Sequence, residues 1–262
     1  MTNIEFNTIG LRIGQVPILK DISFSLKNGE IVGILGPSGC GKTSFFNILS
    51  GLIPQTEGSI LKDGVVVADR AHLCSYMFQD DLLFPWRNIY DNVLLGTEAV
   101  KPDALESRKA DATRLLRLFG LKDFSKKYPH QLSGGMRRRA AFVRTLLNDD
   151  RELFLFDEPT AGLDHLLRLQ VEDTLFHFLM ENQRTSLVIT HDVETAVALV
   201  DRVFIFAPRP AHIAAEVQIG LARKYGSPTA ARTSSEFGDT FQFVLNSYMK
   251  HGTAETLPNV VD

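Results

Sequence analysis

The chain has 262 residues, 44% of them hydrophobic, which is enough to bury a full core and argues against disorder. A formal net charge of -3 gives no overall positive field for nucleic acid or an anionic membrane, so we expect no nucleic-acid partner. Two cysteines are too few for a disulfide framework, and neither a signal peptide nor a run of eighteen apolar residues occurs, so we expect a cytosolic chain.

The predicted strands are of two kinds. Apolar Ile22, Phe24 and Leu26 alternate with polar residues, which predicts a half-buried strand that ends at the turn of residues 28–29. Four short runs are apolar without alternation, as in central parallel strands covered on both faces. These runs span residues 31–35, 153–156, 186–190 and 203–206. Helical patterns separate them, so the fold class is α/β.

Helical patterns divide the rest of the chain. Residues 165–182 carry apolar side chains on a helical period, and so do residues 103–121 and 134–148. We therefore expect an α/β core (residues 1–79 and 151–215), an inserted helical subdomain (80–150) and a C-terminal helical extension (216–262). In that extension, one helix face is expected to pack on the core, formed by Phe237, Phe241, Val244, Leu245 and Tyr248.

The stretch GPSGCGKTS follows the first apolar run directly. It fits the pattern G-x-x-x-x-G-K-[ST] between a strand and a helix, which is the context that a phosphate-binding loop requires. Glycines let consecutive N–H groups surround anionic oxygens, and the following helix adds its positive end. The alternative is a glycine-rich turn with an accidental lysine. We expect Lys42 to reach the β- and γ-phosphates and Thr43 to bind magnesium. The predicted nucleotide-binding residues are Gly36, Pro37, Ser38, Gly39, Cys40, Gly41, Lys42, Thr43 and Ser44.

Two carboxylates end the apolar run of residues 153–156. Open α/β sheets present ligand groups at this end of their strands. Asp157 is expected to hold magnesium through water, and Glu158 to direct the attacking water as general base. Two exposed carboxylates without a role are the alternative.

The stretch HQLSGGMRRR predicts a second anion site. Ser133, Gly134 and Gly135 open a helix whose first N–H groups are free. An ordinary serine N-cap is the alternative. The basic run of residues 137–139 is expected to lie on a solvated face of that helix.

GPSGCGKTS, LSGGM, LFLFDEPTAGLD and VITHD, in this order, resemble the nucleotide-binding subunit of an ABC transporter over approximately residues 4–208. The resemblance implies a P-loop NTPase (ABC ATPase) core with a central, mostly parallel sheet, an N-terminal antiparallel β-subdomain and an inserted helical subdomain. It implies ATP and Mg²⁺ as cofactors. It also implies a second copy of the chain as partner, because the Ser133–Gly135 turn of one copy would meet the γ-phosphate bound by the other.

The resemblance assigns further roles residue by residue. His191 would contact the γ-phosphate and orient water, although a histidine near a helix start is the alternative. Gln79 would sense magnesium and the attacking water, and Asp164 would face the other copy. One position departs from the family: Ile13 stands where an aromatic residue usually stacks on adenine, and an aliphatic contact is weaker and less directional.

The kind of ABC protein follows from spacing and one loop. Roughly 90 residues separate Lys42 from Ser133, too few for the long insert of nucleic-acid ABC ATPases. Residues 79–96 resemble a stretch of importer ATPases for nitrate, taurine and sulfonates, in which Gln79 to Trp86 would contact transmembrane permease subunits. A packed aromatic loop is the alternative there, and an exporter motor or nucleic-acid-associated ATPase is the alternative function. The importer interpretation implies a separate solute-binding protein and a cytoplasmic chain, peripheral on the inner face of the cell membrane.

Overall fold

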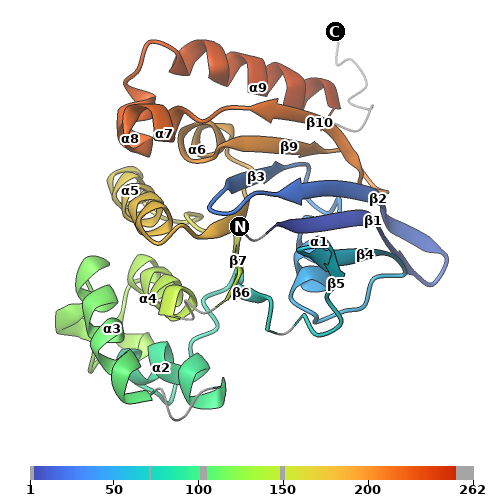
Figure 1. Ribbon diagram of the computed structural model, residues 1–262. Coiled ribbons are helices and arrows are strands. Elements are labelled where there is room, and N and C mark those ends of the chain that lie inside the picture. Colours follow the sequence, from blue (N-terminus) through green and yellow to red (C-terminus); the bar gives the residue numbers. More distant parts are fainter. Residues whose placement is uncertain (1–2, 71, 101–104, 148–150, 252–262) are drawn as a thin grey trace, which may run out of the picture.

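The computed structural model describes residues 3–70, 72–100, 105–147 and 151–251 (Figure 1). Its larger sheet has six strands in the order β10-β9-β3-β8-β7-β6. Neighbouring strands run parallel except β9 and β10, so the predicted central parallel strands are confirmed. The strands are β3 (Ile31–Leu35), β6 (Cys74–Met77), β7 (Leu153–Asp157), β8 (Thr185–Ile189), β9 (Arg202–Phe206) and β10 (Ile213–Gln218).

A second, antiparallel sheet covers one face of this layer. Its strand order is β2-β1-β4-β5, formed by β1 (Ile4–Ile13), β2 (Val16–Leu26), β4 (Glu57–Lys62) and β5 (Val65–Val66). Helix α1 (Lys42–Leu49) contributes Phe45 and Phe46 to the core between the two sheets, where Phe6 and Phe204 also lie. The β-strand expected at residues 22–26 is the last part of β2, with Ile22 and Leu26 buried.

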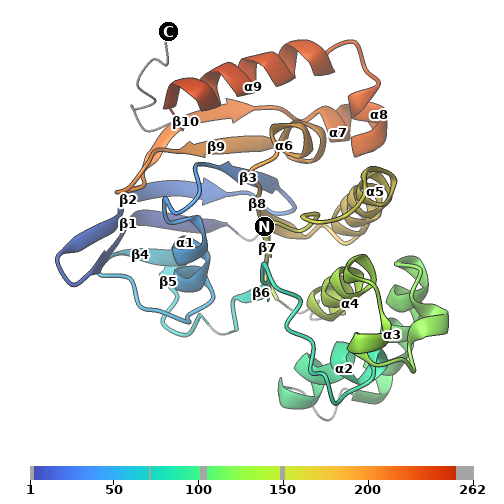
Figure 2. The ribbon, with the colours of Figure 1, turned by 180° about the vertical axis from the view of Figure 1, so that it is seen from behind.

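Helices cover the opposite face of the six-stranded sheet (Figures 1 and 2). They are α5 (His165–Glu181), α6 (Val193–Leu199), α7 (Leu221–Tyr225), α8 (Pro228–Arg232) and α9 (Phe237–His251). The face of α9 predicted from its apolar spacing does pack on the core, with Val244 fully buried. Glu172 on α5 is fully buried and accepts a hydrogen bond from Arg232 Nη2 at 2.6 Å. Arg232 Nε also donates to Glu194 on α6, so α8 is joined to two core helices by ion pairs.

The described part of the chain between β6 and β7 contains helices joined by loops, and no strand. It forms α2 (Ile89–Val100), α3 (Leu105–Leu118), α4 (Gly134–Leu147) and two short 3₁₀ turns, η2 (Lys122–Phe124) and η3 (Pro129–Gln131). Residues 103–104 and 148 of the two predicted helices, and residues 252–262 of the expected extension, lie outside the described residues. The three-part division of the chain stays a prediction. None of the described helices is long and apolar enough to span a membrane.

Candidate functional site

The phosphate loop connects the buried strand β3 to helix α1, as the sequence predicts. Gly39 and Gly41 have φ of 74° and 130°, values that L side chains rarely adopt. Gly41 also lies against strand β2, where an added Cβ would be 2.9 Å from Leu19 Cδ2. Both conformation and space therefore require glycine at position 41, and the loop can curve closely around a bound anion.

Lys42 lies within the loop. Its Nζ donates hydrogen bonds to the main-chain oxygens of Gly36 at 2.6 Å and Pro37 at 2.9 Å. Ser38 and Gly39 at the loop tip are exposed, whereas the Cys40 side chain is buried in the core, so only its main chain faces a ligand. Arg209, which sequence reasoning missed, donates to Gly39 O at 2.7 Å from the turn after β9. Two positively charged side chains, Lys42 and Arg209, therefore contact the main chain of the loop.

The two strongest candidate metal ligands lie side by side. Thr43 Oγ1 donates to Asp157 Oδ2 at 2.9 Å, although 114 positions separate them in the chain. Asp157 is buried at the end of β7, and burial raises the pKa of its carboxyl, opposed by hydrogen bonds from Thr43 and Tyr76 and by the charges of Lys42 and Arg138. Hydroxyl and carboxylate oxygens are ligands that magnesium accepts, so this donor set fits the ion.

Gln79, the third candidate metal ligand, lies two residues beyond β6 with an exposed side chain. Tyr76, on β6 itself, reaches the candidate metal ligand Asp157: its hydroxyl donates to Asp157 Oδ2 at 3.3 Å, and burial raises the pKa of Tyr76, so it stays a donor. The alternation of buried and half-buried residues in β6 was too short a signal to find it. Among the described residues, no cluster of three His, Cys, Asp or Glu side chains could hold a metal.

Glu158 and His191 form a pair at the same edge of the sheet. Glu158 Oε1 and His191 Nδ1 are 2.8 Å apart, and the imidazole is 69% exposed while the carboxylate is 13% exposed. They lie close because β7 and β8 are parallel neighbours that end together, Asp157 opposite Ile189. Glu158 has φ of 50°, a left-handed conformation that costs a non-glycine residue about 1–3 kcal/mol. Strain of this kind is typical of functional positions.

The Ser133–Gly135 turn opens α4. In both views α4 and α1 lie on opposite sides of β6 and β7 (Figures 1 and 2). Ser133 Oγ accepts from Met136 N at 3.3 Å, so the serine caps its helix as well. A Cβ on Gly135 would lie 3.1 Å from Leu167 Cδ2, which places the turn beside the start of α5, where Asp164 is the N-cap.

The predicted adenine contact is a surface residue. Ile13 is 62% exposed at the end of β1, paired with exposed Val16 across the hairpin turn. Ile18 lies two residues after Val16 on β2, and a Cβ added at Gly41 of the phosphate loop would lie 3.2 Å from Ile18 Cγ2. The hairpin tip is therefore an apolar platform near the loop.

The prediction that the basic run lies on a solvated face is wrong for Arg138, which is only 6% exposed. Its guanidinium donates to main-chain oxygens in the segments that follow β6 and β7, among them Phe78 O at 3.0 Å and Pro159 O at 3.1 Å. Helical periodicity treats α4 alone, whereas the ends of two strands cover this side of the helix. No signal in the local sequence pattern reveals that coverage.

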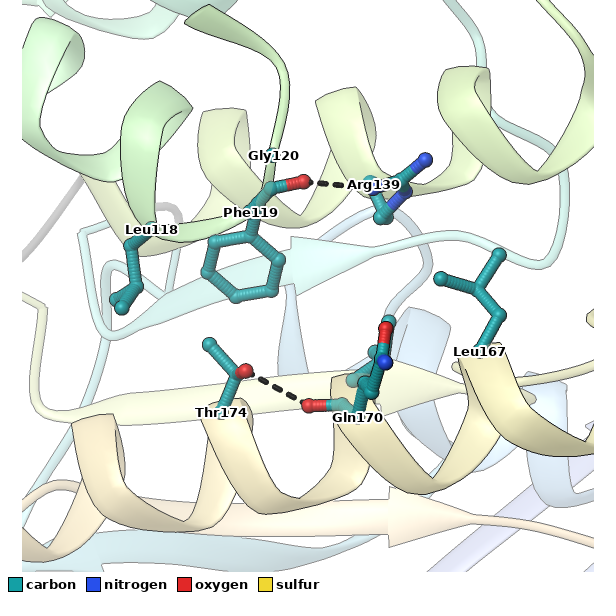
Figure 3. A pocket seen from close by; sticks show the side chains of 8 residues that line it. Leu118, Phe119, Gly120, Arg139, Leu167, Gln170 and Thr174 are labelled. Atoms are coloured by element: carbon teal, nitrogen blue, oxygen red, sulfur yellow. Dashed lines mark hydrogen bonds between the residues drawn. The ribbon is translucent and has the colours of Figure 1, made fainter.

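A cavity of about 290 Å³ lies between α3, α4 and α5 and contains none of the predicted site residues (Figure 3). Phe119, Arg139 and Thr174 are among the residues that line it. Arg139 Nη1 donates to Phe119 O at 2.9 Å, so this arginine holds the end of α3. The candidate chemistry therefore lies at the edge of the sheet, not in this cavity.

A glycine loop between a parallel strand and a helix, with a buried acid on a neighbouring strand beside the loop threonine, defines a P-loop nucleotide-binding protein. The chain belongs to the ABC transporter family, whose family model matches residues 19–161. It is an ATPase of the ATP-binding cassette type.

Curated relatives match nearly the whole chain. An uncharacterized ABC transporter ATP-binding protein, YtlC of Bacillus subtilis, is 41% identical, covering 88% of this chain and 90% of its own length. The taurine import ATP-binding protein TauB of Pseudomonas savastanoi is 36% identical, covering 97% and 99%. The dimeric structure of the ATP-binding cassette MJ0796, in a post-hydrolysis state with ADP and Pi, matches with a TM-score of 0.70 at 26% identity, over 82% and 98% of the chains.

Proposed function

We propose that this chain is the ATP-hydrolysing motor of an ABC importer that takes up a small solute of the taurine, nitrate or sulfonate kind through separate membrane subunits. Several relatives named taurine import ATP-binding protein support the proposal, as does their near-complete coverage by this chain. The observation that carries it is an exposed aromatic pair in the loop that follows Gln79. A separate solute-binding protein would deliver the solute, and the chain would lie at the cytoplasmic face of the membrane.

That aromatic pair is Phe84 and Trp86. Their rings stack with centroids 4.9 Å apart, and Trp86 is 71% exposed. Asn92 on α2 is fully buried and holds the loop: its Oδ1 accepts from Phe84 N at 2.6 Å, and its Nδ2 donates to Phe84 O and Arg87 O. Two large apolar side chains fixed outside the core are typical of an interface anchor.

The same loop also lines a cavity that contains basic side chains. A cavity of about 380 Å³ is lined by Phe78, Leu82, Leu95, Arg144 and Arg151 among others. Arg144 donates to Asp81 O at 2.7 Å and Leu82 O at 2.8 Å, so α4 carries this segment of the loop. A short helix of a membrane subunit, with an apolar face and an acidic residue, fits such a surface.

In the mechanism we propose, ATP is bound by the loop of residues 36–44. Thr43 and Asp157 would hold Mg²⁺, which would supply neutralisation of phosphate charge. Glu158 accepts a proton from the attacking water while His191 orients it. Two copies close head to tail, so that the Ser133–Gly135 turn of one copy meets the γ-phosphate bound by the other. The dimeric cassette with ADP and Pi supports this arrangement. Opening after hydrolysis then resets the membrane subunits.

The test is co-purification of the membrane subunits from native membranes. Trp86→Ala should lose most of the associated permease and of its ATP-driven uptake, because it removes the larger anchor. Phe243→Ala is the matched control, since Phe243 is an exposed aromatic on α9, away from the loop. Equal recovery of permease with wild type and Trp86→Ala, at equal thermal stability, would reject this docking surface.

A further inference from the structure

Arg138 uses every donor that its side chain has. A guanidinium carries five N–H groups in a planar fork, and each one meets a main-chain oxygen here. Nε donates to Pro159 O at 3.1 Å, Nη1 to Phe78 O at 3.0 Å and to Gln79 O, and Nη2 to Asp157 O at 2.9 Å and to Glu158 O. The hydrogen-bond partners of this guanidinium are therefore two backbone segments, residues 78–79 and residues 157–159.

Main-chain oxygens of both segments lie beyond the last pair of the β6–β7 ladder and need hydrogen-bond donors from elsewhere. Strands β6 and β7 are paired from Cys74 opposite Leu153 to Met77 opposite Phe156, and the ladder between them stops there. The oxygens beyond the last pair have lost their strand partners, and buried main-chain oxygens are almost always hydrogen bonded. Arg138 replaces the missing ladder with side-chain donors.

The two segments held in this way carry the two catalytic candidates that do not bind phosphate, Gln79 and Glu158. Arg138 itself lies one helical turn after the Ser133–Gly135 turn on α4. One buried side chain therefore joins the first turns of α4 to the main chain of both candidates. Neighbouring Arg137 and Arg144 donate to the Asp81 carboxylate and to the main-chain oxygens of residues 81–82. Arg138 donates to the end of β7 as well.

We propose that Arg138 is a positioning residue for ATP hydrolysis: it fixes the Gln79 and Glu158 main chain relative to the Ser133–Gly135 turn. The proposal rests on Glu158 being the general base, as assigned under Proposed function. It explains how Glu158 keeps φ of 50°, because its N–H donates to Ile189 O and its carbonyl accepts from Arg138, so both sides of the residue are held. Rotation of that backbone would turn the carboxylate away from His191.

Lysine cannot take over this role. It supplies three donors from one point, whereas the carbonyls approach Arg138 from two segments on different strands. Burial lowers the pKa of Arg138, whereas the nearby carboxylates of Asp157, Asp81 and Glu158 favour its charged form. A lysine would keep the positive charge but not the planar set of five donors. The shape of the guanidinium is therefore what matters.

The experiment measures steady-state turnover and ATP affinity of the purified full-length chain. Arg138→Gln and Arg138→Lys should each lower kcat by roughly 10–100-fold, the loss that a small misplacement of a catalytic group produces. ATP affinity by calorimetry, with magnesium chelated, should change less than about 3-fold, since Arg138 touches no residue of the phosphate loop. Wild-type kcat in Arg138→Lys would overturn the proposal.

A double-mutant cycle with Glu158→Gln separates positioning from general damage. Residual phosphate release, followed with labelled ATP over hours, should be nearly the same in Glu158→Gln and in Glu158→Gln with Arg138→Gln, because the second change then has no base to misplace. An equal fold-loss in both backgrounds would overturn the proposal. Wild-type turnover in Glu158→Gln alone would instead reject Glu158 as base.

Arg139→Gln is the control for loss of an arginine from α4. Its guanidinium holds Phe119 O beside the cavity between α3 and α5, not the catalytic segments (Figure 3). We expect a lowered thermal midpoint but a kcat within about 3-fold of wild type. A loss of kcat equal to that of Arg138→Gln would assign both effects to the helix and overturn the proposal.

Discussion

The phosphate loop and the hydrolysis centre, defined here as Glu158, His191 and Arg138, differ in how the chain builds them. The loop is nine consecutive residues whose conformation is set by their own glycines and by the strand and helix on either side. The hydrolysis centre comes from β7, the end of β8 and the middle of α4. Binding is therefore local, whereas turnover depends on three elements keeping their relative positions. Mutations should separate the two.

Glu158→Gln should break the hydrolysis centre most completely. The amide cannot accept the proton of the attacking water, and general bases contribute about 10²–10⁴-fold, so we expect kcat to fall by that order. ATP binding should persist, and an ATP-bound dimer should accumulate in light scattering. Retained turnover, or loss of nucleotide binding, would contradict the separation.

Lys42→Ala should break the loop. Hydrogen bonds to charged groups contribute about 1.5–3 kcal/mol, so ATP affinity by calorimetry should weaken by roughly 10–100-fold. Lys62→Ala is the control, because Lys62 pairs with Glu152 on a different part of the surface. An unchanged ATP affinity in Lys42→Ala would count against the loop as the phosphate site.

Ile13→Tyr should strengthen ATP binding without changing hydrolysis, which would sharpen the distinction between the two. An aromatic ring at the hairpin tip can stack on adenine, a gain of about 0.5–1.5 kcal/mol, so we expect ATP affinity to rise roughly 2–10-fold. Turnover at saturating ATP should not change. Val65→Tyr places the same ring on an exposed position of β5 and should bind ATP as wild type does.

Asp157→Asn should give the smallest effect, on stability. Because burial raises the pKa of Asp157, its contribution to the stability of the folded state is present at low pH and is lost as pH rises through that raised pKa. At neutral pH the amide should therefore raise the thermal midpoint of the nucleotide-free chain by a few degrees. The difference from wild type should shrink as pH falls; a difference independent of pH would contradict this account.

Much of the fold could be predicted from the sequence, because its signals are local. Residues 31–35 and 153–156 are uninterrupted apolar runs, and both are central strands with every residue buried. The loop glycines, Lys42 and the pair of Thr43 with Asp157 follow from one motif and one strand end. The apolar face of α9 was likewise predicted, since five apolar side chains recur on one helical period.

The contacts that hold the site together could not be predicted. Arg138 was placed in solvent because periodicity describes one helix and not what covers it. Tyr76 donates to Asp157, and Arg209 donates to Gly39 O in the phosphate loop, both from segments that carry no motif. The roles of individual site residues, Ile13 and Asp164 among them, remain predictions.

Arg232 sets a limit on how far the chain can be shortened. Glu172 lies wholly inside the protein, burial raises its pKa, and the guanidinium of Arg232 on α8 is the cation it meets. A truncation after β10, chosen to obtain a minimal cassette, would leave that buried carboxylate without its ion-pair partner and uncover the part of the core on which α9 packs. The segment beyond residue 218 therefore stabilises the α/β core, and shortened versions of the chain should retain it through α9.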